Sequence, residues 1–290
     1  MMKYLKFLPF YLLSIFPLRF LYIVSDFTFF FIYYLVKYRR KVVNSNMERS
    51  FPDKTKVERV RIEKKFYRHF CDVFFETIKC LTISKGEIFK RFKVKDIEMV
   101  EEYYQQEKNI IIYTAHFGNW EWFGFLPLFL PHQCTAFYQK LSSNYFNHLM
   151  QIIRSRYGII CMESSNAYRG LVNLEKDNKF TFNCIIGDQS PGVKTSKHWV
   201  KFLHQDTAFL VGPDRIAKKL NYVVIFSTFK KFKRGKYELR FSLIARNPKE
   251  IESSELIASY SKKLEESIFT SPEMWLWTHN RWKLTRPDTT

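Results

Sequence analysis

The sequence predicts an α/β fold, with a central mostly parallel or mixed sheet flanked by helices and a hydrophobic membrane-anchor segment at the N-terminus. Short apolar, β-branched runs alternate with longer segments of helical periodicity through the centre of the chain, which is typical of layered α/β sheets. Residues 4–36 are strongly hydrophobic and a basic cluster follows them at once. We therefore expect an anchor at residues 1–45 and a single folded domain at residues 46–290.

The hydrophobic N-terminal segment is too long for one straight spanning helix. As one helix, residues 4–36 would extend roughly 50 Å, whereas the hydrocarbon core of a bilayer is about 30 Å thick. Arg19 and Asp26 interrupt the segment. We expect one helix up to about Leu18 and a second from about Arg19, with either one of them spanning the bilayer or both lying in its interface. No small-residue cleavage site follows, which disfavours a cleaved signal peptide.

The charge of the chain requires an acidic partner. The net charge is +19, and aromatic residues make up 18% of the sequence. Nucleic acid, an anionic membrane, a phosphorylated lipid and an acidic carrier protein all meet this requirement, and the aromatic content favours contact with lipid. The cluster at residues 37–41 places the rest of the chain on the cytoplasmic side by the positive-inside rule. The five cysteines form no Cys-x-x-Cys pair, so we expect reduced thiols.

The expected elements follow from apolar periodicity and from turn residues. We expect strands at residues 92–97, 110–113, 134–138, 158–162, 180–186, 222–229 and 237–245, and helices at residues 54–82, 98–107, 120–130, 140–156 and 252–269, with further helix starts near 166 and 212. The last two strands form a hairpin with a basic tip, residues 230–236. A solvated tip is the default expectation, and contact with a membrane or an acidic carrier is the sharper one.

The stretch from Asn109 to Trp122 carries the candidate chemistry. A buried strand ends there, His116 follows it, and Glu121 lies in the first turn of the next helix. On one continuous helix the two side chains would be about 140° apart, whereas a loop before the helix lets them converge. An imidazole oriented by a carboxylate can take a proton from a hydroxyl. The alternative is a structural histidine and a glutamate that complements the helix dipole.

Two motifs support the catalytic interpretation through a resemblance. The run His-Phe-Gly-Asn-Trp-Glu-Trp resembles the His-x4-Asp/Glu motif of the glycerolipid acyltransferase superfamily, in the form that lipid A late (secondary) acyltransferases carry. The ending from Pro272 to Lys283 closely resembles the Pro-x-x-Trp-x-Trp-x-His-x-Arg-Trp-Lys ending of that family. Residues 38–52 resemble the start of its soluble part, so the likeness covers about residues 38–284. It implies a glycerolipid acyltransferase-like fold, with the catalytic domain at residues 46–290.

The resemblance implies transfer of a fatty acyl chain from an acyl carrier protein thioester to a hydroxyl of a lipid A precursor. His116 would act as the general base, and Glu121 would hold the imidazole in the right tautomer. Backbone N–H groups of Gly118 and Asn119, at a helix N-terminus, are candidates for stabilising the oxyanion, and Arg169 is another.

Further candidate residues lie later in the chain. The family carries an arginine at a place comparable to Arg169 that helps to hold substrate. Asp188 and Gln189 directly follow a buried strand and resemble a family pair, so they would bind substrate or steady a loop. His279 is a second candidate base, ranked lower because no acidic residue stands near it in the sequence.

Residues 194–202 read as a basic and aromatic loop suited to phosphate contact. The run that follows departs from the family pattern, since Leu203 and His204 stand where Phe and Gly are usual. This departure puts a detailed transfer of loop function in doubt.

The sequence has no Gly-rich phosphate loop, no Gly-x-Ser-x-Gly elbow and no metal-ligand spacing, so we expect no cofactor and no metal. The expected partners are an acyl carrier protein thioester, a phosphorylated lipid acceptor and an anionic membrane surface, and not nucleic acid. The expected location is the inner membrane, with the catalytic domain on the cytoplasmic side. Two alternatives stay open: an acyltransferase for a lysophospholipid or amino-acid lipid, and a non-catalytic, membrane-anchored protein that binds an anionic ligand.

Overall fold

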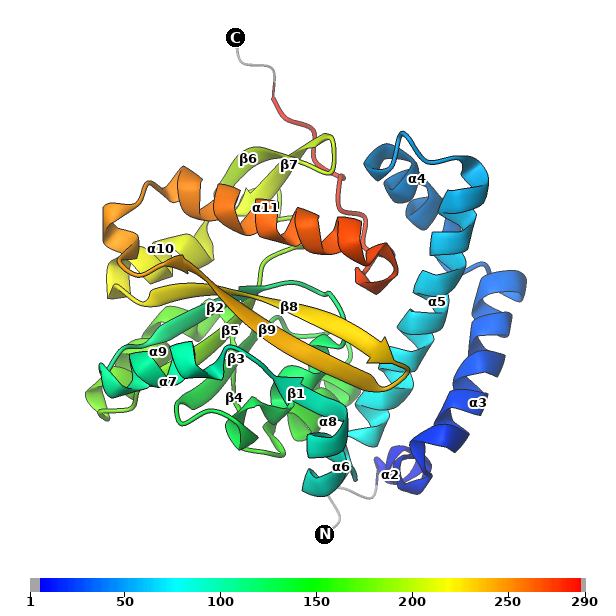
Figure 1. Ribbon diagram of the computed structural model, residues 1–290, viewed down its shortest axis with the longest axis horizontal. Coiled ribbons are helices and arrows are strands. Elements are labelled where there is room, and N and C mark those ends of the chain that lie inside the picture. The colour runs from blue at the N-terminus through cyan, green and yellow to red at the C-terminus, as the bar shows by residue number, and fades with distance from the viewer. Residues whose placement is uncertain (1–5, 288–290) are drawn as a thin grey trace.

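A seven-stranded sheet forms the centre of the computed structural model, which describes residues 6–287 (Figure 1). The first five residues of the expected anchor and the last three of the expected catalytic domain lie outside the described part. The strand order is β1-β9-β8-β2-β5-β3-β4. Strands β8, β2, β5, β3 and β4 run parallel, and β9 runs antiparallel to β8. The expected α/β class with a mostly parallel or mixed sheet is confirmed.

The elements have the following bounds. The strands are β1 (Phe92–Val94), β2 (Ile110–Thr114), β3 (Gln133–Tyr138), β4 (Ile160–Glu163), β5 (Thr181–Ile186), β6 (Lys197–Phe202), β7 (Gln205–Leu210), β8 (Val223–Lys233) and β9 (Lys236–Ala245). The α-helices are α2 (Leu8–Ile15), α3 (Leu18–Phe30), α4 (Arg40–Ser50), α5 (Lys56–Lys79), α6 (Lys85–Arg91), α7 (Ile97–Gln105), α8 (Asn144–Ser155), α9 (Ala167–Lys176), α10 (Gly212–Leu220) and α11 (Ser253–Thr270). Shorter helical turns are η1 (Phe31–Leu35), η2 (Trp120–Leu128), η3 (Ser164–Asn166), η4 (Pro248–Glu250) and η5 (Pro272–Met274).

The central strands β2 and β5 have the composition that burial on both faces requires. Every residue of β2 is buried, and so is β5 up to its last residue. Apolar runs of this kind are typical of parallel strands covered by helices on both sides. The register pairs Thr114 of β2 with Ile186 of β5. The carboxyl ends of these two strands therefore meet at one edge of the sheet.

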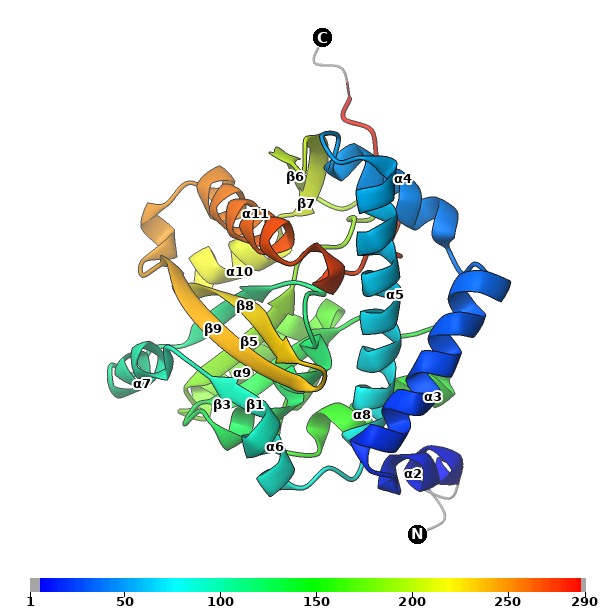
Figure 2. The same cartoon turned by 45° about the vertical axis from the view of Figure 1, so that its right-hand side comes forward.

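Helices cover both faces of the sheet. In Figure 1, α11 lies above the sheet and α8 below it. The long helix α5 stands beside the sheet, and Thr55 and Glu58 close its N-terminus with a capping box. Figure 2 shows α3 running along the outer side of α5. One contiguous apolar core joins these elements, from Phe7 to Trp277.

The N-terminal helices break where the sequence predicts. Helix α2 ends at Ile15, and α3 begins at Leu18 directly after Pro17. The segment Leu18–Leu35, made of α3 and η1, is long and apolar enough to cross a membrane by length and composition.

Two local expectations need correction. Residues 197–202, expected as a loop, form strand β6, which pairs with β7 in a separate two-stranded sheet. The turn between them is made by Leu203 and His204, which both have positive φ. A two-residue turn with positive φ at both positions matches the right-handed twist of the two strands that it joins. Residues 120–128 form a 3₁₀ helix rather than an α-helix, with Pro127 inside it.

The tip of the β8–β9 hairpin is not a freely solvated loop. Arg234 at the tip donates hydrogen bonds to Asp26 of α3 and to Asp72 of α5. Gly235 follows with φ +67°, and a Cβ atom there would lie 1.8 Å from the Tyr22 hydroxyl oxygen. The tip is therefore packed against the N-terminal helices, and glycine is required for that close approach.

Candidate active site

His116 and Asp188 meet because they occupy equivalent positions after two neighbouring parallel strands. Each lies two residues beyond the paired strand ends Thr114 and Ile186. The His116 Nδ1–H donates to Asp188 Oδ1 over 2.8 Å, and the His116 backbone N–H donates to Oδ2 over 3.1 Å. The His116 side chain keeps 20% of its surface exposed. A hydrogen bond at Nδ1 leaves Nε2 as the ring nitrogen that can take a proton.

Asp188 is buried and held by a third donor. The Trp275 indole N–H donates to its Oδ2 atom over 2.8 Å. Burial raises the pKa of the Asp188 carboxyl, but His116 and the hydrogen bonds from His116 and Trp275 outweigh burial and lower this pKa below its usual value. A carboxylate that stays ionised in this position fixes the tautomer of the imidazole and offsets the charge that the ring gains on protonation.

Glu121 has a different partner from the one that the sequence predicts. Its carboxylate accepts two hydrogen bonds from Arg154 of α8, over 2.7 and 2.8 Å, and one from the Trp120 indole N–H over 3.1 Å. Burial raises the pKa of Glu121, but the charge and hydrogen bonds of Arg154 outweigh burial and lower it, with a smaller contribution from His116. In this structure the carboxylate bonded to the imidazole is that of Asp188, and Glu121 interacts with the ring through its charge. The Trp120 ring lies edge-on to the imidazole at 5.3 Å.

The Trp-rich C-terminal segment holds the His116 loop in place. Phe117 forms an isolated antiparallel bridge with Trp275. The Gly118 N–H donates to the Met274 carbonyl over 3.0 Å, and the Leu276 N–H donates to the His116 carbonyl over 3.1 Å. The two most specific sequence motifs are thus neighbours in space, although 149 residues separate them.

The Gly118–Asn119 turn serves the architecture of the loop. Gly118 has φ +68°, and a Cβ atom there would lie 2.4 Å from Phe229 Cβ. Its N–H is committed to Met274, and its carbonyl oxygen faces His69 Nε2 at 3.0 Å. Asn119 is fully buried, and its amide donates to Glu76 Oε2 over 2.6 Å. The Gly118 N–H is therefore not available to an oxyanion in this arrangement.

Arg169 and Gln189 are exposed, and neither is among the described hydrogen-bond partners of His116 and Asp188. Arg169 is on α9, which follows β4 at the far edge of the sheet. Strand β4 lies three strands from β2, which is roughly 14 Å of sheet width. Gln189 follows Asp188 but is exposed. The structure therefore brings Asp188 to His116, and it does not bring Arg169 or Gln189 into that pair.

His279, the second candidate base, is engaged elsewhere. Its Nε2 atom accepts a hydrogen bond from the Ser190 N–H over 3.0 Å. Burial lowers the pKa of His279 to about 4, with Asp188 opposing that shift and Arg281 adding to it. A ring that is neutral at physiological pH and already accepts a backbone proton is poorly placed to take one from a substrate.

The chain matches the family model described as bacterial lipid A biosynthesis acyltransferase over residues 2–284. It belongs to this family. It is 22% identical over 243 residues to a lipid A biosynthesis acyltransferase of Haemophilus influenzae, covering 83% of this chain and 74% of the relative. It is 23% identical over 256 residues to the lipid A biosynthesis palmitoleoyltransferase of Escherichia coli strain K12, covering 87% of this chain and 81% of the relative. The chain is accordingly an enzyme, an acyltransferase of lipid A biosynthesis, as the sequence motifs predict.

Sequence reasoning missed the role of α5 in the architecture of this acyltransferase. His69, Asp72 and Glu76 repeat at spacings of three and four residues and are all buried. His69 reaches the Gly118 carbonyl oxygen, and Glu76 holds Asn119. Burial and the nearby Lys231 lower the pKa of His69 to about 3, so its ring is neutral. A stripe of polar residues inside an otherwise apolar helix face was the available signal.

Glu76 predicts a measurable pH dependence of the stability of the enzyme. Burial raises its pKa to about 7, and it accepts hydrogen bonds from the Tyr22 and Tyr237 hydroxyls. Between its unfolded value of 4.5 and about 7 the native state binds more protons, so the free energy of unfolding falls as pH rises through this window. We expect this fall in the free energy of unfolding, on the order of 3 kcal/mol, to be absent from Glu76→Gln. The measurement is urea unfolding of both proteins at a series of pH values from 5 to 8.

The matched control is Glu101→Gln, which removes an exposed carboxylate on α7. Its unfolding free energy should follow the wild-type pH curve. Parallel curves for wild type and Glu76→Gln would contradict the assignment of this titration to Glu76.

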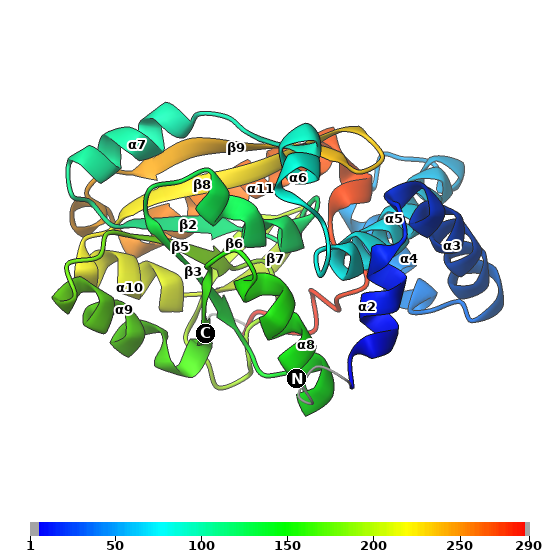
Figure 3. The same ribbon diagram turned by 90° about the horizontal axis from the view of Figure 1, so that it is seen from below.

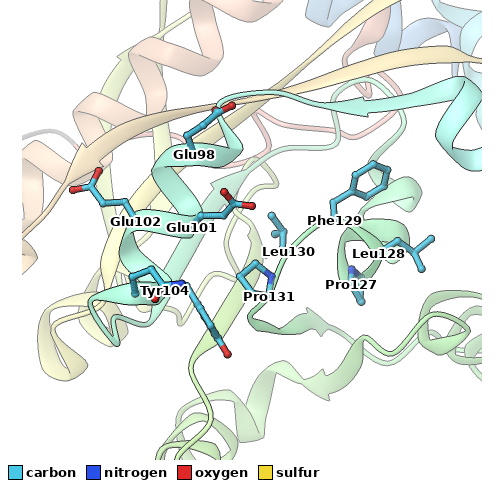
Figure 4. Close-up of a pocket in the computed structure, with 10 residues that line it drawn as sticks. Glu98, Glu101, Glu102, Tyr104, Pro127, Leu128, Phe129, Leu130 and Pro131 are labelled. Atoms are coloured by element: carbon cyan, nitrogen blue, oxygen red, sulfur yellow. The ribbon is translucent and has the colours of Figure 1, made fainter.

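A pocket on the enzyme surface lies between α7 and the segment that leads to β3. Glu98, Glu101 and Glu102 of α7 line it together with the stretch Pro127–Pro131, and Figure 4 shows the Glu101 carboxylate pointing toward that stretch. Helix α7 precedes β2, so this pocket is near the amino ends of the parallel strands, whereas His116 is at the carboxyl end. Its carboxylates would repel a phosphorylated substrate.

Proposed function

We propose that the enzyme transfers a fatty acyl chain from an acyl carrier protein thioester to a hydroxyl of a lipid A precursor, at the cytoplasmic face of the inner membrane. The observation that carries the proposal is the His116–Asp188 pair, held by Trp275 at the carboxyl edge of the sheet. In α/β sheets this edge is where ligands bind. The net charge of +19 suits both a phosphorylated acceptor and an acidic carrier.

In the proposed reaction, His116 Nε2 takes the proton of the acceptor hydroxyl while the oxygen attacks the thioester carbonyl carbon. The C–O bond forms, and the carbonyl oxygen becomes an oxyanion. Collapse of this intermediate breaks the C–S bond, and the imidazolium returns its proton to the leaving thiolate. The products are an acyl ester and a free carrier thiol.

The surrounding residues take supporting roles in this proposal. Asp188 is a positioning residue for the imidazole, and Glu121, the acidic residue of the His-x4-Glu motif, stabilises its positive charge from a greater distance. Arg154 keeps Glu121 ionised and in place. Arg169, Asn119 and Gln189 stay candidates for contact with a substrate that reorders the site on binding.

The division of labour along the chain is also a proposal. Residues 1–45 would hold the enzyme at the membrane, and residues 46–290 would carry out catalysis. This proposal is supported by the exposed large apolar side chains of the described residues, more than half of which lie before residue 39.

The direct test uses purified full-length enzyme with an acylated carrier protein and a lipid A precursor, and the products are analysed by mass spectrometry. We expect a product heavier by one acyl chain and release of the carrier thiol. A lysophospholipid and an amino-acid lipid are tested in parallel. Acylation of either in preference to the lipid A precursor would overturn the acceptor assignment, and absence of transfer to all three would overturn the proposed reaction.

A further inference from the structure

Helix α3 and the turn η1 that continues it expose a long row of large apolar side chains. These side chains recur at spacings of three and four residues and form one continuous stripe, in which Phe27 is 72% exposed. We call this stripe the outer face; its members are Phe20, Ile23, Phe27, Phe30, Phe31 and Tyr34. Helix α2 continues it with Leu8, Leu12, Ile15 and Phe16. An apolar patch of this extent on an isolated chain indicates a surface that meets lipid or protein.

The inward side of α3 buries Leu18, Leu21 and Phe29 beside polar groups that are bonded to the rest of the enzyme. Tyr22 donates to Glu76 over 2.8 Å, and Ser25 donates to Asp72 over 2.8 Å. Asp26 is bonded by Arg234 of the β8–β9 hairpin over 2.8 and 2.9 Å. Moving α3 away into a bilayer would leave Asp26 unpaired in hydrocarbon and uncover Asp72 and Glu76. Helix α3 is therefore fixed to α5 along its length.

Helix α5 carries positive charges beside the end of α3 and beside η1. The Arg68 guanidinium lies 5.0 Å from the centre of the Phe29 ring, and the Lys64 ammonium lies 5.7 Å from that of Tyr34. If α3 crossed the bilayer while packed on α5, these charges would enter the hydrocarbon, where each is costly. Helix α2 has only eight residues, about 12 Å of length, and is too short to span.

We propose that α2 and α3 lie in the plane of the membrane interface, with the outer face in the acyl chains, and that neither helix crosses the bilayer. This inference rests on the proposed membrane location of the enzyme but not on its chemistry. The partner is the surface of an anionic bilayer, because exposed cations flank both ends of the stripe. These are Arg19 at one end and Lys37, Arg39 and Lys41 at the other. Cations beside an in-plane apolar face add attraction to anionic headgroups.

The arrangement has a consequence for the substrate. The tip of the β8–β9 hairpin is bonded to α3 through Arg234, and Phe232 beside it is exposed. In-plane docking of α3 therefore also brings this hairpin tip to the membrane surface. Glu76 of α5 bonds both Tyr22 of α3 and Asn119 of the Gly118–Asn119 turn, so the His116 loop keeps a fixed distance from the lipid.

The sidedness of the N-terminus tests the proposal. The full-length enzyme carries one protease-cleavable epitope at each end, and it is examined in intact spheroplasts and in inverted inner-membrane vesicles. We expect both epitopes to be cut in inverted vesicles and both to be protected in spheroplasts. Cleavage of the N-terminal epitope alone in spheroplasts would show that α3 spans and would overturn the proposal. Recovery of the enzyme in the soluble fraction would also overturn it.

A second measurement tests the outer face without relying on activity. Phe27→Glu should lower flotation of the purified enzyme with phosphatidylglycerol–phosphatidylethanolamine vesicles by at least about tenfold. The matched control is Tyr168→Glu, which adds the same charge at an exposed ring on α9, at the opposite end of the molecule in Figure 3. Circular dichroism checks that both variants are folded. Equal loss in the two variants, or no loss in Phe27→Glu, would overturn the assignment of the outer face. Neither readout involves acyl transfer, so failure here is separable from failure of the proposed reaction.

Discussion

Replacing His116 by alanine should lower acyl transfer by about 10³-fold or more, with little change in stability. Among the described groups bonded to Asp188, the ring alone offers a nitrogen for proton transfer, since the Trp275 indole and the His116 backbone can only donate. Without it the acceptor hydroxyl must attack as a neutral nucleophile, which costs the contribution of a general base. The side chain is partly exposed at the edge of the sheet, so its removal opens no core cavity. The measurement is kcat/KM with acylated carrier protein and lipid A precursor.

The control for this prediction is His204→Asn. His204 is exposed at the β6–β7 turn with φ +65°, a conformation that asparagine tolerates. Its turnover should match that of wild type. Turnover retained in His116→Ala, with normal thermal unfolding of the variant, would remove His116 from the mechanism.

The strands of the parallel sheet were predictable because burial on both faces leaves a clear record in the sequence. Runs such as Ile110–Thr114 and Thr181–Ile186 are mostly apolar and short, which is typical of strands buried on both faces. The β6 strand was not predictable in the same way. It belongs to a small separate sheet, and most of its side chains are only half-buried. Lysine and histidine stand among its aromatic residues, so the sequence shows no apolar run there.

The partners within the site could not be read from spacing. Asp188 was recognised as a candidate, but its pairing with His116 depends on the β2–β5 register, which only tertiary structure fixes. The sequence contains no signal that Arg154, on α8, would reach Glu121. The prediction for Glu121 followed from its nearness in the chain to His116, and nearness in the chain does not determine which carboxylate faces a ring.

Hydrogen bonds join the motif near the N-terminus to the motif near the C-terminus. Arg39 donates to the Thr278 carbonyl over 2.9 Å, and the Asn46 amide donates to the carbonyls of Trp277 and His279 over 3.0 and 2.9 Å. The N-terminal motif thus holds the C-terminal segment, and that segment in turn holds the His116 loop through Trp275. Side chains that take no part in the reaction therefore help to set the position of the His116 ring.

The pair Asp188 and Glu121 allows the structure-based assignment to be tested against the sequence-based one. Asp188→Asn should lower kcat by roughly 10² to 10⁴-fold, the range seen when an orienting carboxylate loses its charge. The amide can accept from His116 Nδ1–H, but its nitrogen cannot accept the Trp275 and His116 backbone N–H donors.

Glu121→Gln should behave differently, since it breaks a buried ion pair with Arg154. We expect a loss of stability on the order of 3 kcal/mol, because Arg154 is left without its anionic partner. The kcat of the folded variant should fall less than that of Asp188→Asn, and adding Arg154→Gln should restore part of the stability. If Glu121→Gln instead lowered kcat by the larger factor while Asp188→Asn kept most of its turnover, the glutamate of the His-x4-Glu motif would be the residue that orients His116. The hydrogen bond to Asp188 would then be a feature of the resting site that rearranges when substrate binds.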